Sequence, residues 1–194
     1  MTLDLKAADY TLSGLRPFPV AVTTIHQGRA NGLVSLSAGS GGIVPEAPRV
    51  TISLTKYNQT HDMVLSSGIF AMHLLAASPE PALEASLRIL MGLGGSSGRD
   101  GDKIGAFATK PGVTGAPILL DALSYVEGKV VGTLDAEENT IFLADVVGAE
   151  RLREGERLRI GEAWRRLPAE WIERYEANHV PQVDSARRNR GLTR

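Results

Sequence analysis

Four polar residues that lie close together in the chain could hold a phosphate. They are Lys56, Asn58, Thr60 and His61. An ammonium supplies charge, and amide and hydroxyl groups donate hydrogen bonds, which is the chemistry that recognises a phosphate. Lys56 is the only cation in the stretch 54–60, so we expect it to meet the phosphate. An exposed polar turn is the plainer alternative.

A run of small residues precedes this cluster and would let a flat ligand approach the backbone. It contains Ser37, Ser40 and Gly41, and it is rich in glycine throughout. Such a run exposes many backbone N–H groups and places few side chains in the way. We therefore expect a flat ring on this loop and a phosphate at the end of the next strand. A β-hairpin with a polar loop is the alternative.

The elements that would position these residues are mostly strands. Apolar, β-branched runs predict strands over residues 20–25, 32–36, 49–54 and 69–75, and a long hairpin over 123–133 and 140–151. The dipeptide Asn31-Gly32 predicts the turn of the first hairpin. Hairpin connections and few helices favour a mainly β protein with accessory helices, an α+β barrel.

Helices are predicted at three places. Thr60 would cap a helix over 61–67, Ser78 would cap one that ends at Gly92, and residues 168–177 have an amphipathic pattern. The segment 1–18 is expected to be extended, because prolines stand at its end. Residues 92–103 are expected to form a loop or a mobile lid, and residues 151–161 an exposed segment.

Composition limits the function classes. The 194 residues carry a net charge of −1, so the protein has no general attraction for nucleic acid. It has no cysteine, and its four histidines lack metal-ligand spacing, so we expect no metal site. No secretory signal and no apolar run of membrane-spanning length are present, which predicts a cytoplasmic protein. We expect one domain over residues 1–179 and a polar, basic tail over 180–194.

Taken together, four segments resemble the flavin reductase-like family, the FMN-binding split barrels. They are residues 18–24, residues 31–54, residues 56–75, and the stretch from Ser97-Gly98-Arg99 to the arm 138–147. The resemblance implies a split β-barrel, a homodimer with FMN between its subunits, and NAD(P)H as co-substrate. It also implies the small reductase component that supplies reduced flavin to a partner monooxygenase.

The resemblance also implies which residues touch the ligands. The implied cofactor-binding residues are Val34, Ser35, Leu36, Ser37, Ser40, Gly41, Ser53, Lys56, Asn58, Thr60 and His61. Asn139 and Lys103 are implied on the nicotinamide side, and no side chain is singled out as catalytic. Relatives often begin the last long strand with Gly-Asp-His, whereas this chain reads Glu137-Glu138-Asn139. Asn139 can hydrogen-bond an amide but cannot carry a proton.

Three functions remain open from the sequence. The first is an NAD(P)H:flavin oxidoreductase. The second is an FMN-binding split-barrel protein without NAD(P)H turnover, which the missing histidine favours. The third is a split-barrel interaction module or haem-binding module that holds no flavin.

Overall fold

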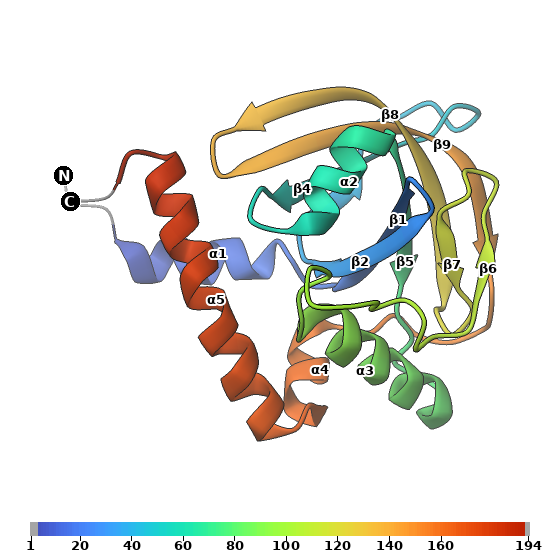
Figure 1. Ribbon diagram of the computed structural model, residues 1–194. Coiled ribbons are helices and arrows are strands. Elements are labelled where there is room, and N and C mark those ends of the chain that lie inside the picture. The colour runs from blue at the N-terminus through green and yellow to red at the C-terminus, as the bar shows by residue number, and fades with distance from the viewer. Residues whose placement is uncertain (1–3, 193–194) are drawn as a thin grey trace.

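A curled antiparallel sheet forms the body of the protein, and helices flank it (Figure 1). The structure is a computed structural model, and it describes residues 4–192. In chain order the elements are α1 (Leu5–Gly14), β1 (Val20–His26), β2 (Arg29–Ser35), β3 (Ala38–Ser40), β4 (Arg49–Thr55), α2 (Gln59–Ser67), β5 (Ile69–Leu74), α3 (Glu80–Gly94), β6 (Thr109–Pro111), β7 (Pro117–Leu119), β8 (Ser124–Ala136), β9 (Asn139–Arg151), α4 (Ile160–Arg166) and α5 (Ala169–Asn189).

The main sheet has seven strands in the order β2-β1-β5-β8-β9-β4-β3, and β6 pairs with β7 in a small second sheet. The long β8–β9 hairpin has irregular register between Glu127 and Gly128 and between Val130 and Gly132. Such irregularities bend strands and increase their twist, which lets the hairpin curl around the sheet. This architecture confirms the predicted mainly β, split-barrel fold.

Two groups of buried side chains make up most of the core. Inside the barrel, Ile52, Phe70 and Phe142 are fully buried. On the other side of β1, Leu83 and Leu93 of α3 pack in a second cluster. The barrel therefore buries one cluster within itself and covers its outer face with α3.

A buried histidine and a buried glutamate attach the 112–119 segment to the barrel. His73 donates through Nδ1 to the Ala21 carbonyl and accepts at Nε2 from the Leu119 N–H, both at 3.1 Å. Burial lowers the pKa of His73 to about 4, so the ring is neutral at pH 7. Glu127 accepts from the Val113 N–H at 3.0 Å and from the Thr114 N–H at 2.8 Å. His73 is a satisfied core histidine, as its apolar strand predicts.

The predicted strands are confirmed, with one misplaced turn. The β1–β2 turn lies at Gln27 and Gly28, which have positive φ values of 49° and 75°. Asn31 and Gly32 instead lie within β2, where the buried Asn31 side chain accepts the Gly32 N–H at 2.8 Å. The prediction from the Asn-Gly pair was wrong because the buried tertiary environment of Asn31 outweighs its local turn preference. The short strands β3, β6 and β7 were also not expected.

The helices differ more from expectation. Residues 5–14 form α1 rather than an extended segment, because Asp4 caps the helix by accepting the N–H groups of Lys6 and Ala7. α2 begins two residues earlier than predicted, α3 continues to Gly94, and α4 was missed. α5 does not end near residue 177 but continues to Asn189, so most of the predicted tail is helical.

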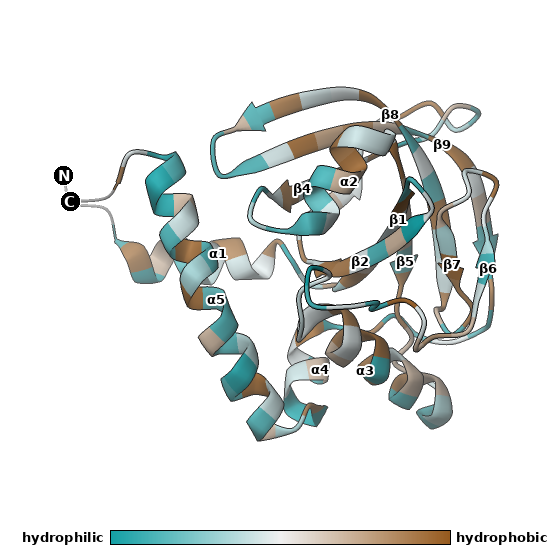
Figure 2. Ribbon diagram, viewed as in Figure 1, coloured by the Kyte–Doolittle hydropathy of each residue, from teal (hydrophilic) through white to brown (hydrophobic). Residues whose placement is uncertain are grey.

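The two terminal helices extend away from the barrel on one side of the molecule (Figure 1). Figure 2 shows that α5 is mostly hydrophilic, in contrast to the apolar strands of the barrel. α1 buries none of its residues, and α5 buries only Trp171. Among residues 4–192, no helix combines the length and the apolar character needed to cross a membrane.

Candidate functional site

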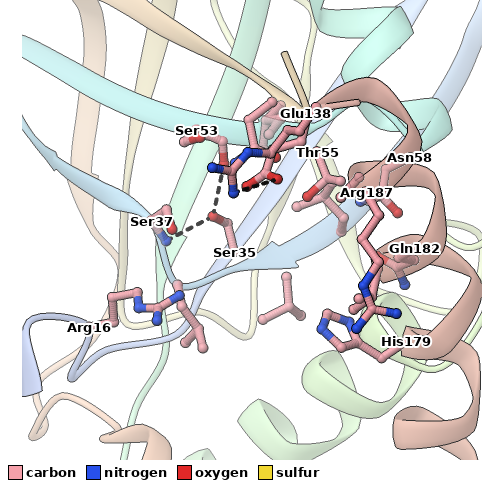
Figure 3. Close-up of a pocket in the computed structure, with 18 of the residues that line it drawn as sticks. Arg16, Ser35, Ser37, Ser53, Thr55, Asn58, Glu138, His179, Gln182 and Arg187 are labelled. Carbon is pink, nitrogen blue, oxygen red and sulfur yellow. Dashed lines mark hydrogen bonds and ion pairs between the residues drawn. The ribbon is translucent and has the colours of Figure 1, made fainter. Parts of the chain in front are cut away.

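A cavity of about 550 Å³, which we call the main cavity, lies between the sheet and α5 (Figure 3). One wall comes from the barrel and contains Leu33, Val34, Ser35, Leu36, Ser37, Ser53, Leu54, Thr55, Asn58, Glu138 and Asn139. The other wall comes mainly from α5. The predicted ring-binding stretch 34–37 therefore lines a cavity, together with the predicted residues Ser53, Asn58 and Asn139.

Three serines on the barrel wall are held by one another and by the backbone (Figure 3). Ser35 Oγ accepts the Ser37 N–H at 3.1 Å and lies 3.5 Å from the Ser53 carbonyl. The Ser53 N–H donates to the Ser37 carbonyl at 2.8 Å. These contacts join the end of β2 to β4 and give the wall fixed hydroxyl and backbone groups.

The opposite wall uses one face of α5. Tyr175, His179, Gln182 and Ala186 line the cavity at helical spacing, and Arg190 extends the same face. Burial raises the pKa of Tyr175. The sequence prediction ended the helix near residue 177 and missed this wall, because α5 buries only Trp171 and contains Pro181, so no apolar period marks its second half.

Each end of α5 is attached differently. At its start, Trp171 is buried and its indole N–H donates to the Met91 carbonyl at 3.3 Å. At its end, Arg190 lies 3.9 Å from a Glu137 carboxylate oxygen and 3.7 Å from one of Glu138. These ion pairs connect α5 to the β8–β9 turn across the main cavity.

A second cavity of about 340 Å³, the loop cavity, adjoins the first. It is lined by the first residues of α2 and by the loop over residues 95–100, and it includes Thr60 and Lys103. Arg99 lies at its edge, where Nη1 donates to the Tyr57 carbonyl at 2.9 Å and Nη2 lies 3.6 Å from Asp62. Among the described residues, no side chain caps the N-terminus of α2.

Lys103 joins this loop to the end of α3. Its ammonium donates to the Ser96 carbonyl at 2.8 Å and to the Leu93 carbonyl. Burial of the ammonium lowers the pKa of Lys103 to about 8. The loop is therefore fixed at one point, close to the place where the resemblance implies the nicotinamide.

Two residues of the predicted phosphate cluster have other partners. Lys56 Nζ lies 2.6 Å from Asp135 and lines neither cavity. His61 is buried, with Nδ1 2.8 Å from Asp62 and Nε2 2.8 Å from the Thr140 hydroxyl. The structure therefore brings Asn58 and Thr60 to the loop cavity but leaves Lys56 and His61 outside it. Arg99 and Lys103 are the cations that line it.

Ser40 and Gly41 also lie outside both cavities. Ser40 is exposed at the end of β3, and its hydroxyl donates to the Gly42 carbonyl at 3.0 Å. The Gly41 N–H donates to the Arg49 carbonyl at 2.8 Å. In this structure the Gly41 donor is thus already used within the sheet.

Comparisons with known proteins agree with this fold. A family model described as the flavin reductase like domain matches residues 14–167. The chain is 30% identical over 155 residues to a high molecular weight rubredoxin of Moorella thermoacetica, a match that covers 79% of this chain and 62% of that protein. The chain thus spans less than two thirds of this relative.

Two further matches cover more of the other protein. A ferric-chelate reductase (NAD(P)H) of Archaeoglobus fulgidus is 28% identical over 136 residues, which is 70% of this chain and 76% of that one. Nitrilotriacetate monooxygenase component B of Mycobacterium thermoresistibile has the same fold, with a TM-score of 0.63, 23% identity and coverage of 87% and 92%. Because the family model matches most of its residues, the chain belongs to the flavin reductase-like family.

Proposed function

We propose that the protein binds FMN and reduces it with NAD(P)H. The observation that carries this proposal is that the main cavity and the loop cavity meet. Both are lined by Leu33, Val34, Asn58, Tyr175 and Gln182. A ligand with a flat ring at one end and a phosphate at the other could therefore extend from the serines of β2 to the N-terminus of α2.

The residues present suit such a ligand. In the main cavity, the hydroxyl groups of Ser35, Ser37 and Ser53 suit the polar edge of an isoalloxazine ring, and Leu33 offers an apolar surface. In the loop cavity, the uncapped start of α2 and the guanidinium of Arg99 suit a phosphate. The donor set of the two cavities thus fits FMN.

Bound FMN would supply the hydride chemistry, and the protein supplies position and exclusion of water. We propose that α5 covers the ring and that Asn139 orients the carboxamide of the nicotinamide. Lys103 holds the 95–103 loop near the same place. We assign no proton-transfer role to a side chain, because Asn139 stands where relatives carry histidine.

Two measurements test this function. The purified protein should absorb near ~450 nm once FMN is bound, which is a property of oxidised flavin cofactors. Stopped-flow mixing with NADH should then reduce the flavin faster than NADH reduces free FMN. Binding without faster reduction would favour the FMN-binding alternative. Absence of any flavin binding would favour the interaction or haem-binding module.

We further propose that the reduced flavin serves a partner monooxygenase. The basis is the likeness to nitrilotriacetate monooxygenase component B, which shares the fold at 23% identity. A monooxygenase that accepts diffusible reduced flavin should turn over when mixed with this protein, NADH and FMN. Dependence of that turnover on this protein is the expected result.

A cytoplasmic homodimer is the assembly we propose. α1 and the residue that follows it leave apolar side chains in solvent, with Leu5 72%, Tyr10 83% and Leu15 73% exposed. Apolar surface of this kind usually marks an interface. Sedimentation at micromolar concentration should give about twice the 20.7 kDa chain mass. A monomer that still binds flavin would contradict the dimer but not the flavin site.

A further inference from the structure

We propose that a third cavity, the tryptophan chamber, binds a flat, uncharged aromatic molecule beside the flavin site. The chamber has a volume of about 730 Å³ and lies where α1, α3, α4 and α5 meet the end of β2. Its main walls are Trp164, Trp171, Tyr175, Leu90, Val34 and Leu36. This proposal goes beyond FMN binding, because it concerns a second ligand in a separate cavity.

The aromatic side chains of the chamber form surfaces at right angles to one another. Trp171 and Tyr175 stack at 5.2 Å with an interplanar angle of 21°. Trp164 meets Tyr175 at 5.4 Å and 83°, and Trp171 at 6.2 Å and 82°. Tyr175 also stacks on His179 at 6.4 Å, so the half-buried ring of Trp164 is the face left for a ligand. A flat aromatic ligand can stack on that ring and present its edge to the neighbouring rings, which are the two favoured aromatic geometries.

The chamber is also partly fixed before any ligand binds. The Trp171 indole is held by its hydrogen bond to the Met91 carbonyl, and the indole is almost fully buried. A wall that is already ordered costs little conformational entropy on binding. The aromatic surfaces therefore provide a binding wall rather than a flexible patch.

The charges around the chamber disfavour an anion. Its charged lining residues are Asp9, Arg16 and Glu176, two carboxylates against one guanidinium. The remaining lining residues are apolar, aromatic or small and uncharged. Transfer of an unpaired charge to such a wall is costly, so an uncharged ligand is favoured over its anionic analogue.

The chamber shares a wall with the main cavity. Arg16, Val34, Leu36 and Tyr175 line both. A ligand in the chamber and a flavin in the main cavity would thus contact opposite sides of the same residues. Binding of one should change the affinity for the other, and the two changes must be equal by linkage.

Intrinsic fluorescence tests the proposal directly. The chain has two tryptophans, and both line the chamber. Titration of the flavin-free protein with menadione should quench their emission along a saturating curve, with a Kd on the order of 0.1 mM or tighter. The anionic analogue 1,4-naphthoquinone-2-sulfonate should bind at least about tenfold more weakly. Linear quenching equal to that of N-acetyltryptophanamide would overturn the proposal.

Two glycine substitutions provide a matched pair. Gly161 lines the chamber, and a Cβ there would meet no atom within 4 Å, so Gly161→Leu should occupy part of the space without a clash at that atom. Gly132 in β8 has the same open surroundings but lies outside the chamber lining. We expect Gly161→Leu to lower the affinity for menadione about tenfold and Gly132→Leu to leave that affinity unchanged. Equal effects would overturn the proposal.

The result stays separable from the flavin proposal. FMN binding is followed by the flavin's own absorbance, so a protein that binds menadione but not FMN contradicts only the proposed function. A protein that binds FMN but quenches linearly with menadione contradicts only the chamber. If Gly161→Leu fails to fold, the neutral and anionic quinones on the unaltered chain still decide the outcome.

Discussion

The barrel and the terminal helices are stabilised by different interactions. In the barrel, large side chains such as Phe70 and Phe142 are fully buried between paired strands. α1 buries no residue, and α5 buries one of its 21. The barrel therefore has its own core, whereas the terminal helices depend on edge contacts and on whatever binds against them.

The two walls of the main cavity show the same difference. The barrel wall of the main cavity is fixed by strand pairing and by the Ser35, Ser37 and Ser53 contacts. The α5 wall beyond Pro181 is closed by the Arg190 ion pairs, which are exposed and worth about 0–1 kcal/mol. One wall is thus rigid and the other can adapt, which suits a site that must admit and release a ligand.

The largest expected effect is on barrel stability. Phe142→Ala should lower the free energy of unfolding by about 3–5 kcal/mol, because the ring is fully buried and its loss leaves a cavity. Denaturation in guanidinium chloride measures the change.

The counterpart for the helices is a chain that ends after His179, at the predicted domain boundary. Removal of residues 180–194 should lower the free energy of unfolding by no more than about 1 kcal/mol, because the side chains of residues 180–192 are exposed or half-buried. It should weaken FMN, because Gln182, Arg187 and Arg190 leave the cavity wall. Loss of folding on truncation would show that the two regions are not independent.

The next effect is on how the stability of the barrel depends on pH, through His73. The folded pKa is lowered to about 4 from 6.5, so below pH 6.5 the unfolded chain binds a proton that the folded chain does not. Stability is complete above pH 6.5 and falls towards pH 4, by roughly 3 kcal/mol in all. His73→Gln should reduce the slope of the free energy of unfolding against pH between pH 6.5 and 4. An unchanged slope would show that His73 does not carry it.

A fourth prediction concerns the phosphate. Arg99→Ala should lower the affinity for FMN about ten- to a hundredfold, because a charge-assisted contact is worth about 1.5–3 kcal/mol. It should lower the affinity for riboflavin, which has no phosphate, much less. Lys56→Ala is the matched variant. The sequence prediction expects the same loss from it, whereas its ion pair with Asp135 favours little change. Fluorescence titration with both flavins distinguishes the two cations.

The sequence predicted the barrel better than the helices for a physical reason. The run 20–25 carries a local apolar, β-branched signal and the run 69–75 a local apolar signal, and the burial of both strands confirms them. α1 and the second half of α5 bury no residue, so their sequences do not carry an apolar pattern that would predict a helix. α1 depends on its cap at Asp4. The second half of α5 is an exposed continuation of a helix that is anchored at Trp171.

The site was partly predictable for the same reason. The stretch 34–37, Ser53 and Asn139 lie on predicted strands or their ends, and the structure brings them to one cavity. Arg99 and the α5 wall come from segments distant in sequence, so their place depends on tertiary packing. Lys56 was selected by charge alone, and the acidic partner Asp135 lies 79 residues away.

The smallest expected effect lies on the rigid wall, at Asn139. It is the first residue of β9, pairs with Thr55 of β4, and lines the main cavity beside Glu138. If its amide orients the nicotinamide, Asn139→Ala should raise the KM for NAD(P)H by roughly fivefold, the loss of about one hydrogen bond. FMN affinity should change less, and Asn139→Gln should restore part of the loss. Because no histidine stands here, the rate should lack an inflection near pH 6–7 arising from this position. Steady-state kinetics with both variants measures the change, and a fall in FMN affinity larger than the rise in KM would place Asn139 on the flavin instead.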